Sequence, residues 1–230
     1  MTKMLVSVRD VAEALIAAEG GADFIDLKEP RAGALGGLPI ETIAAIVKAL
    51  RHGGSTLPVS ATIGDLPMAP LAPILAQVQA VAGCGVDYVK VGIERSPDAL
   101  PVLRALAACG HAVVPVFIAD RGLDADAVKL ACSLGFPGLM VDTADKKAGS
   151  LFDVLTAAEL RRFLQAVRAA GALAGLAGAL RLQDLPALRE LAPDFAGFRS
   201  AVCAGDRGAA LDARRLRALA EAMREAAVGA

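Results

Sequence analysis

Short apolar runs rich in valine and isoleucine alternate along the chain with longer segments whose apolar positions recur at helical spacing. The short runs have the length and composition of buried strands, and the longer segments have the period of helices. Strands are predicted at residues 4–7, 23–28, 57–63, 87–92, 112–118, 138–142, 172–177 and 194–199. Helices are predicted at residues 9–19, 39–51, 71–83, 97–108, 124–133, 156–170, 182–191 and 211–227.

This alternation of strand and helix predicts an α/β protein built as a single (β/α)8 TIM-type barrel. The main alternative is an open, doubly wound sheet, whose G-x-G-x-x-G fingerprint would directly follow the first strand. Ser7-Val8-Arg9-Asp10 occupies that place instead, which favours the barrel. Because no linker, low-complexity tract or block of charge interrupts the pattern, we expect residues 1–230 to form one domain.

A weak internal repeat supports the barrel and points to one of its rims. Residues 21–28 (GADFIDLK), 85–90 (GVDYVK) and 194–199 (DFAGFR) each place an aspartate near the start of a strand and a cation at its end. In such a barrel the carboxyl ends of the strands form the rim where chemistry takes place. The charged residues expected at this rim are Lys28, Lys90, Asp142 and Arg199.

Two ionisable residues lie close together on the second predicted strand. Asp26 and Lys28 are two positions apart, so their side chains project from the same face of the strand. Burying both charges costs free energy unless they are paired or used in chemistry. One interpretation is a structural ion pair at a strand end. The other is a reactive lysine, with Asp26 orienting its amine or carrying protons.

Lys90, at the end of the fourth predicted strand, favours the reactive interpretation. An apolar interior and a neighbouring ammonium group both lower the pKa of a lysine, and the neutral amine can attack a carbonyl to form a Schiff base. The alternative for Lys90 is a side chain that extends to solvent. Tyr88 is expected to share the inward face with Lys90 and to serve for packing.

The polar loop after the sixth predicted strand adds two candidates. Asp142 ends an apolar run, so its carboxylate is expected to project over the mouth of the barrel. Lys146 follows on a loop that can fold over a phosphorylated substrate. The alternative for this loop is an ordinary charged surface segment.

The last two predicted strands are followed by segments suited to binding an anion. Loops after strands seven and eight of a barrel often present backbone N–H groups to a phosphate. Gly175 and Gly178 lie near the first loop, and Arg199 and Ser200 near the second. Either Arg199 or Arg207 can add a bidentate contact. Because glycines are common in loops, this prediction depends on the barrel.

Composition limits the partners. Hydrophobic residues make up 55% of the 230 residues and aromatic residues 3%, which excludes a disordered chain. The 24 basic residues are balanced by 25 acidic ones, so no basic field is present to hold a nucleic acid. The two histidines are far apart, and the four cysteines are widely spaced without a C-x-x-C motif. We therefore expect no metal site and no disulfide framework, but buried thiols.

The surroundings of the protein follow from the same sequence. Residues 1–10 lack the apolar core of a signal peptide, and free thiols suit a reducing compartment, so a cytoplasmic protein is expected. The uncharged stretch 66–86 is interrupted by prolines and glutamines, which indicates a loop and a buried helix rather than a membrane span. Because the helix at 71–83 has no charged face, we expect it to pack against another subunit of a homo-oligomer.

Five motifs together resemble the (5-formylfuran-3-yl)methyl phosphate synthase family, along nearly the whole chain. They are GGADFIDLKEPRAGALG (20–36), VSATIGDLP (59–67), VDYVKVG (86–92), MVDTADKKAGSLFD (140–153) and LAGALR (176–181). The resemblance implies a lyase without a cofactor that joins two molecules of glyceraldehyde 3-phosphate, with loss of phosphate and water. The product is the furan precursor of methanofuran and methylofuran.

The same resemblance implies roles for individual residues. Lys28 would form the Schiff base and Lys90 would accept a proton, while Asp26, Asp142 and Lys146 match further polar residues of the family's site. The choice of Lys146 over Lys147 depends on the alignment of a variable loop. Two other functions remain open, namely a class I aldolase that acts on another phosphorylated sugar and a non-catalytic barrel that binds sugar phosphates.

Overall fold

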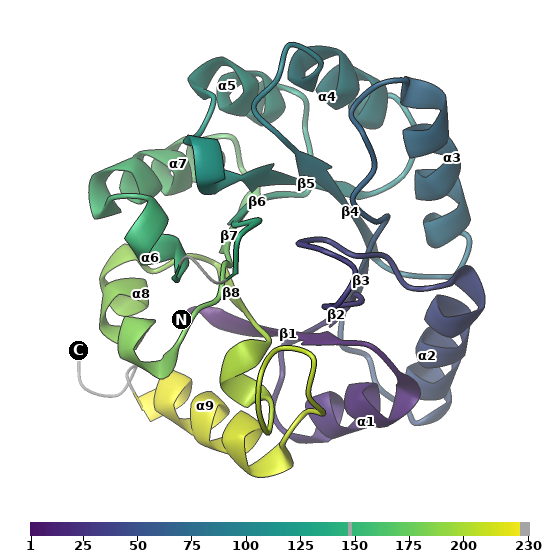
Figure 1. Ribbon diagram of the computed structural model, residues 1–230, viewed down its shortest axis with the longest axis vertical. Coiled ribbons are helices and arrows are strands. Elements are labelled where there is room, and N and C mark those ends of the chain that lie inside the picture. The colour runs from purple at the N-terminus through teal and green to yellow at the C-terminus, as the bar shows by residue number, and fades with distance from the viewer. Residues whose placement is uncertain (147–148, 226–230) are drawn as a thin grey trace.

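The computed structural model describes residues 1–146 and 149–225, which form a closed barrel of parallel strands surrounded by helices (Figure 1). Each strand pairs with the next along the chain, and β8 pairs with β1 to close the ring. This closure confirms the predicted (β/α)8 barrel and excludes the open sheet. The strands are β1 (Lys3–Val8), β2 (Phe24–Leu27), β3 (Val59–Thr62), β4 (Tyr88–Ile93), β5 (Val113–Ile118), β6 (Gly138–Asp142), β7 (Leu173–Leu176) and β8 (Phe195–Phe198).

The helices follow the strands in chain order and cover the outside of the barrel (Figure 1). All the predicted helices are present, although residues 226–227 of the last one lie outside the described residues. The α-helices are α1 (Val11–Glu19), α2 (Ile40–His52), α3 (Leu71–Ala82), α4 (Ala99–Ala107), α5 (Ala125–Ser133), α6 (Leu151–Val154), α7 (Ala157–Ala169), α8 (Leu185–Leu191) and α9 (Ala213–Glu225). Short 3-10 helices are η1 (Ala119–Arg121), η2 (Leu182–Asp184) and η3 (Ser200–Val202).

The short helix α6, which the apolar pattern did not predict, lies in the connection between β6 and α7. It begins at a Ser-x-x-Asp sequence in which the Asp153 carboxylate accepts a hydrogen bond from the amide of Ser150 at 2.7 Å. A polar pair at this spacing caps the free N–H groups at the start of a helix. The helix therefore depends on its cap rather than on hydrophobic periodicity.

Alternate residues of each strand belong to two separate cores. Val6 and Val8 of β1 are buried against the surrounding helices in the larger cluster. Leu5 faces the interior of the barrel, where it packs in a smaller cluster with Phe195. Tyr88 belongs to this inner cluster, as predicted. The period of two therefore decides which side chains can line a site inside the barrel.

The inward positions near the carboxyl ends of the strands are polar. The register places Ser7 opposite Asp26, Asp26 opposite Ser60, and Thr62 opposite Lys90. All five of these residues are buried. Since polar groups in an interior require partners, this layer is where the structure concentrates its interactions.

The stretch at residues 66–86 forms a loop and α3, which buries Ile74, Val78 and Val81. No helix within residues 1–146 and 149–225 has the length and apolar character needed to cross a bilayer. The four cysteines are free thiols, but Cys203 alone is fully buried and the others are half-buried. The prediction of buried thiols therefore holds for one of the four.

Candidate active site

A small cavity lies inside the barrel at the carboxyl ends of the strands. All five of the predicted catalytic residues line it, and so do Gly178, Arg199 and Ser200 from the predicted phosphate site. The charged residues of its lining are Asp26, Lys28, Lys90, Asp142, Lys146, Arg199 and Arg207. The barrel thus brings together side chains from strands far apart in the sequence.

Asp26 is fully buried at the centre of this cluster. Its Oδ1 accepts hydrogen bonds from Lys90 Nζ at 3.0 Å and from Ser60 Oγ at 2.7 Å, and its Oδ2 accepts one from Ser7 Oγ at 3.0 Å. Burial alone would raise the pKa of Asp26, but the charges of Lys90 and Lys28 outweigh burial and hold it below its usual value. The possible Asp26–Lys28 ion pair is not formed, because Asp26 contacts Lys90 instead.

Lys28 is also buried, but its ammonium group is bonded weakly. Its Nζ lies 3.7 Å from Asp142 Oδ2 and 3.4 Å from the carbonyl oxygen of Ala34, and both distances are long for a hydrogen bond. Burial lowers the pKa of Lys28 to about 8; the charge of Asp142 opposes this shift and that of Lys146 adds to it. With this pKa about a tenth of Lys28 carries a neutral amine at pH 7, far more than for an unperturbed lysine.

Asp142 has one oxygen that accepts hydrogen bonds and one that faces the ammonium group of Lys28 at 3.7 Å without a hydrogen bond. Oδ1 accepts hydrogen bonds from Lys146 Nζ and from the amide of Thr143, the latter at 2.8 Å. Oδ2 is buried and has no hydrogen-bond partner among the described residues. Burial opposes ionisation, but Lys146 and Lys28 together lower the pKa of Asp142 to about 2, so it is a carboxylate at neutral pH. Its free lone pairs are suited to a substrate hydroxyl.

The turn that carries Lys146 is tied to the neighbouring loop. The Asp120 carboxylate, just after β5, accepts hydrogen bonds from the amides of Ala144 and Asp145, the latter at 2.8 Å. Lys147, the other lysine considered for this position, lies outside the described residues. Lys146 therefore reaches Asp142 from a turn held at its backbone.

Backbone amide groups line the cavity beside β7 and β8. Gly178 has a φ of 121°, and a Cβ at this position would lie 2.9 Å from Thr143 Oγ1, so a glycine is required. The amides of Gly178 and Ala179 donate to no acceptor among the described residues. Ser200 begins the 3-10 helix η3 and lines the same cavity. This geometry leaves donors free for an anion.

Two residues predicted for phosphate binding are placed differently. Gly175 lies within β7 and is not among the residues that line the cavity; a Cβ there would lie 2.2 Å from the ring of Phe195, so the structure places it at a packing position. Arg199 lines the cavity, but all five of its N–H bonds are directed to Glu13, Ser7 and two backbone carbonyls of residues 207 and 209. Its guanidinium group therefore has no donor left for a phosphate.

Sequence reasoning missed the two serines that complete the Asp26 site. Ser7 and Ser60 occupy inward positions of β1 and β3, and their hydroxyl groups satisfy Asp26. The sequence signal that could have identified them is a polar residue at an inward position of an otherwise apolar strand. The described residues contain no group of three or more His, Cys, Asp or Glu residues arranged to hold a metal ion.

The closed barrel and the charged cavity at its C-terminal rim are those of a (β/α)8-barrel enzyme. The model of the 4-HFC-P synthase family matches residues 4–220. The chain belongs to this family of (5-formylfuran-3-yl)methyl phosphate synthases, which confirms the resemblance read from the sequence motifs.

Individual relatives agree with this placement. A (5-formylfuran-3-yl)methyl phosphate synthase of Methanopyrus kandleri is 36% identical over 96% of this chain and 98% of its own length. A protein of Methylorubrum extorquens that provisionally carries the same name is 40% identical over 96% of this chain and 92% of its own length. Among solved structures, 3-hexulose-6-phosphate synthase from Salmonella typhimurium superposes with a TM-score of 0.67 at 20% identity, covering 98% of this chain and 100% of that one. This last likeness supports the fold alone.

Proposed function

We propose that this enzyme condenses two molecules of glyceraldehyde 3-phosphate, with loss of phosphate and water, into (5-formylfuran-3-yl)methyl phosphate. This product would serve the synthesis of methanofuran or methylofuran. Membership of the synthase family supports the overall reaction. The observation that carries the mechanism is the state of Lys28, a buried and weakly bonded amine whose pKa is lowered to about 8.

The proposed chemistry begins at that amine. Lys28 adds to the aldehyde carbon of one substrate, and loss of water from the adduct leaves an iminium ion. The iminium withdraws electrons from the neighbouring carbon, so that a base can remove its proton. The electron pair left behind, as an enamine, can expel phosphate from the next carbon or attack the carbonyl carbon of the second molecule.

The other residues of the cavity have matching roles. Lys90 and Asp26, held 3.0 Å apart, form the group that takes up and returns the proton. Asp142 accepts a substrate hydroxyl at its free Oδ2, and Lys146 fixes the carboxylate from the other side. The amides of Gly178 and Ala179, together with Ser200, provide a phosphate site. No cofactor enters this scheme, because a lysine supplies the electron sink.

The decisive experiment removes the amine. Wild-type protein incubated with glyceraldehyde 3-phosphate is expected to release inorganic phosphate and to develop a furan absorbance. Borohydride should trap the substrate on Lys28, as located by mass spectrometry. Lys28→Ala should lose both signals, whereas Lys48→Ala, which alters an exposed lysine of α2, should keep them. Full activity in Lys28→Ala would contradict the proposal.

The two alternative functions give different results in the same assay. A class I aldolase would be trapped by borohydride but would release no phosphate and form no furan. A non-catalytic barrel that binds sugar phosphates would leave Lys28 unmodified after borohydride treatment. The combination of trapping, phosphate release and furan formation is therefore specific to the proposed reaction.

We further propose that the chain acts as a single domain in a cytoplasmic homo-oligomer. The support for the oligomer is α3, which carries no charged residue and exposes small side chains such as Ala72 and Ala76. Light scattering at working concentrations is expected to give a mass above that of one chain. A monomer under those conditions would remove this part of the proposal.

A further inference from the structure

The loop that follows β2 contacts the amine of Lys28 through one peptide group, which joins Ala34 to Leu35. Its carbonyl oxygen lies 3.4 Å from Lys28 Nζ. Its N–H donates to the Asp65 carboxylate, with Oδ1 at 3.1 Å and Oδ2 at 3.4 Å. Among the described residues, no other hydrogen bond reaches either end of this peptide group. A single peptide unit therefore connects a carboxylate on the loop after β3 to the candidate nucleophile.

Packing fixes the place of this peptide group but not its rotation. The Leu35 side chain is buried in the inner cluster of the barrel, and a Cβ added to Gly92 on β4 would lie 2.9 Å from it. A well-packed side chain holds its own residue in place, yet the preceding peptide plane can still turn. Because the N–H of that plane faces the Asp65 carboxylate, the hydrogen bond determines where the carbonyl on the opposite side points.

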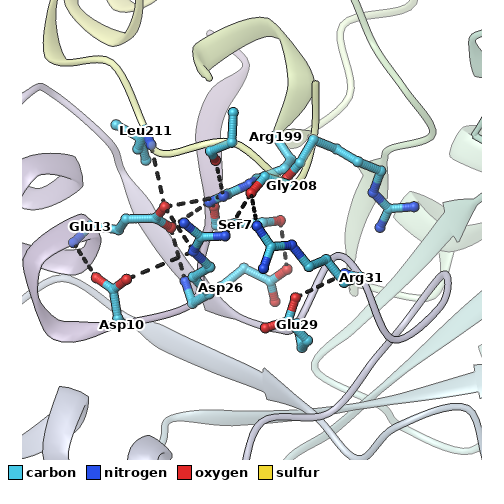
Figure 2. A network of polar contacts seen from close by, with 12 residues as sticks. Ser7, Asp10, Glu13, Asp26, Glu29, Arg31, Arg199, Gly208 and Leu211 are labelled. Carbon is cyan, nitrogen blue, oxygen red and sulfur yellow. Dashed lines mark hydrogen bonds and ion pairs between the residues drawn. The ribbon is translucent and has the colours of Figure 1, made fainter. Parts of the chain in front are cut away.

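The loop after β2 is fitted closely around Asp65. Gly33 has a φ of 113°, and a Cβ at this position would lie 1.9 Å from Asp65 Oδ2, so a glycine is required to admit the carboxylate. The loop after β8 holds the other side of the same segment (Figure 2). Arg207 Nη2 donates to the carbonyl oxygen of Gly33 at 3.1 Å, and Arg31 Nη2 donates to that of Gly208 at 3.0 Å. The segment beside Lys28 is therefore held from two sides.

We propose that Asp65 is a positioning residue for Lys28 and that it acts through the Ala34–Leu35 peptide group. A neutral amine has two N–H bonds and one lone pair, arranged tetrahedrally with the bond to carbon. The acceptors near Nζ are the Ala34 carbonyl oxygen at 3.4 Å and Asp142 Oδ2 at 3.7 Å. N–H bonds directed at these two acceptors leave one direction for the lone pair. Since Lys28 lines the cavity, a substrate carbonyl there would meet an amine that is already oriented.

The negative charge of Asp65 strengthens this contact. A carboxylate that accepts a peptide N–H polarises the peptide group, so the carbonyl oxygen becomes a better acceptor. The Ala34 oxygen can then accept an N–H of the amine, and later the single N–H that remains when Lys28 has become an iminium ion. This inference rests on the proposed function, since it assigns Asp65 to the step in which Lys28 attacks an aldehyde.

The first test measures the Lys28 amine itself and needs no turnover. Formaldehyde with cyanoborohydride methylates neutral lysine amines, and mass spectrometry locates the label. In the wild type, labelling of Lys28 is expected to rise with pH through a midpoint near 8. In Asp65→Ala the midpoint should move to lower pH, because the Ala34 carbonyl turns away and the ammonium form loses an acceptor. Asp65→Asn, which keeps an acceptor oxygen for the Leu35 amide, should stay near the wild-type midpoint.

The labelling experiment contains its own controls. Lys48, exposed on α2, is methylated in the same sample and corrects for the strength of the reagent at each pH. Asp98→Ala, which alters another exposed aspartate on the same rim, should keep the wild-type midpoint. The variants leave in place the other charged groups that act on Lys28, namely Asp26, Lys90, Asp142 and Lys146.

Kinetics with glyceraldehyde 3-phosphate provide the second readout. We expect kcat to fall about 10-fold in Asp65→Ala with little change in KM, since the amine is misoriented while the substrate contacts remain. Asp65→Asn should recover most of this loss. An unchanged labelling midpoint in Asp65→Ala, or no recovery in Asp65→Asn, would overturn the positioning role whatever the activity. If the midpoints moved as expected but the wild type formed no furan, the proposed function would fail and the effect of Asp65 on Lys28 would stand.

Discussion

Lys28 and Lys90 illustrate how two buried lysines in one cavity come to have different properties. Lys90 donates to a fully buried carboxylate that two serine hydroxyls also hold in place. Lys28 has an aspartate at 3.7 Å and another lysine competing for that aspartate. Burial penalises the ammonium form of Lys28 with little compensation, and its pKa falls to about 8. This difference supports the proposal that Lys28 acts as the nucleophile and that Lys90 moves protons.

A pH dependence of the reaction follows from this pKa. The amine of Lys28 must be neutral to attack a carbonyl, so kcat/KM is expected to rise with pH and to level off above an inflection near 8. An unperturbed lysine would place that inflection near 10.5. The measurement is the initial rate of phosphate release at low substrate concentration, in buffers from about pH 6 to pH 10. A profile that is flat through pH 8 would contradict the assignment of Lys28 as the nucleophile.

The period of two along β2 was enough to predict that Asp26 and Lys28 share the cavity. It could not predict the partners, because these depend on how the strands are staggered around a closed barrel. The stagger brings Asp26 to Lys90, which is 64 residues away in sequence, and Lys28 to Asp142. The pairing of Gly175 on β7 with Phe195 on β8, which packs its ring against the glycine, could not be predicted for the same reason.

At the scale of whole elements, carboxylates on neighbouring loops hold the segments that carry the candidate catalytic lysines. Asp65, after β3, accepts hydrogen bonds from the amide of Leu35 in the loop that follows Lys28. Asp120, after β5, accepts hydrogen bonds from the amides of Ala144 and Asp145 in the turn that precedes Lys146. The strand ends were predictable from apolar runs, whereas these contacts between loops were not, because they join segments with no periodic signal.

Removal of the Asp120 carboxylate tests this arrangement. Asp120→Ala leaves two amide groups without their acceptor, so the turn loosens and Lys146 is displaced from Asp142. We expect kcat to fall about 10- to 100-fold, since small displacements of a positioning group are costly. Asp120→Asn, which keeps an acceptor oxygen, should recover part of the loss.

The control for Asp120 is another exposed aspartate on the same rim. Asp98 precedes α4 and makes no side-chain capping bond, so Asp98→Ala should leave kcat unchanged. Circular dichroism melting curves should show that both alanine variants are folded. An unchanged kcat in Asp120→Ala would remove Asp120 as a positioning residue.

At the scale of the whole molecule, the closure of the barrel between β8 and β1 is reinforced by a buried ion pair (Figure 2). Glu13, on α1, binds Arg199 through both carboxylate oxygens and also accepts the amide of Leu211 ahead of α9. Arg199 also donates a hydrogen bond to the carbonyl oxygen of Ser7 on β1. The sequence placed Arg199 as a cation at the end of a strand, and we therefore predicted that it binds phosphate. Its carboxylate partner lies 186 residues earlier in the chain and could not be inferred from local pattern.

Substitution of either Glu13 or Arg199 is expected to lower the stability of the protein strongly. Removing one partner leaves the other charge buried and unpaired, which costs about 3–5 kcal/mol of unfolding free energy. Glu13→Gln and Arg199→Met are each expected to lower the urea midpoint strongly. Because the protein contains no tryptophan, unfolding is best followed by circular dichroism. The double variant should lose less unfolding free energy than the two single variants lose together, since neither charge is then left buried without its partner.

The exposed pair of Arg161 and Glu190, on α7 and α8, provides the matched comparison for this last prediction. Its nitrogen and oxygen lie 2.6 Å apart, as close a contact as in the buried pair, but solvent screens both charges. Arg161→Met should therefore change the urea midpoint far less than Arg199→Met does. If Arg161→Met and Arg199→Met lowered the urea midpoint by similar amounts, the buried pair would contribute no more stability than an exposed one. Barrel closure would then not depend on it. If the single and double variants of the buried pair were strictly additive, the two side chains would act independently and the closure argument would fail.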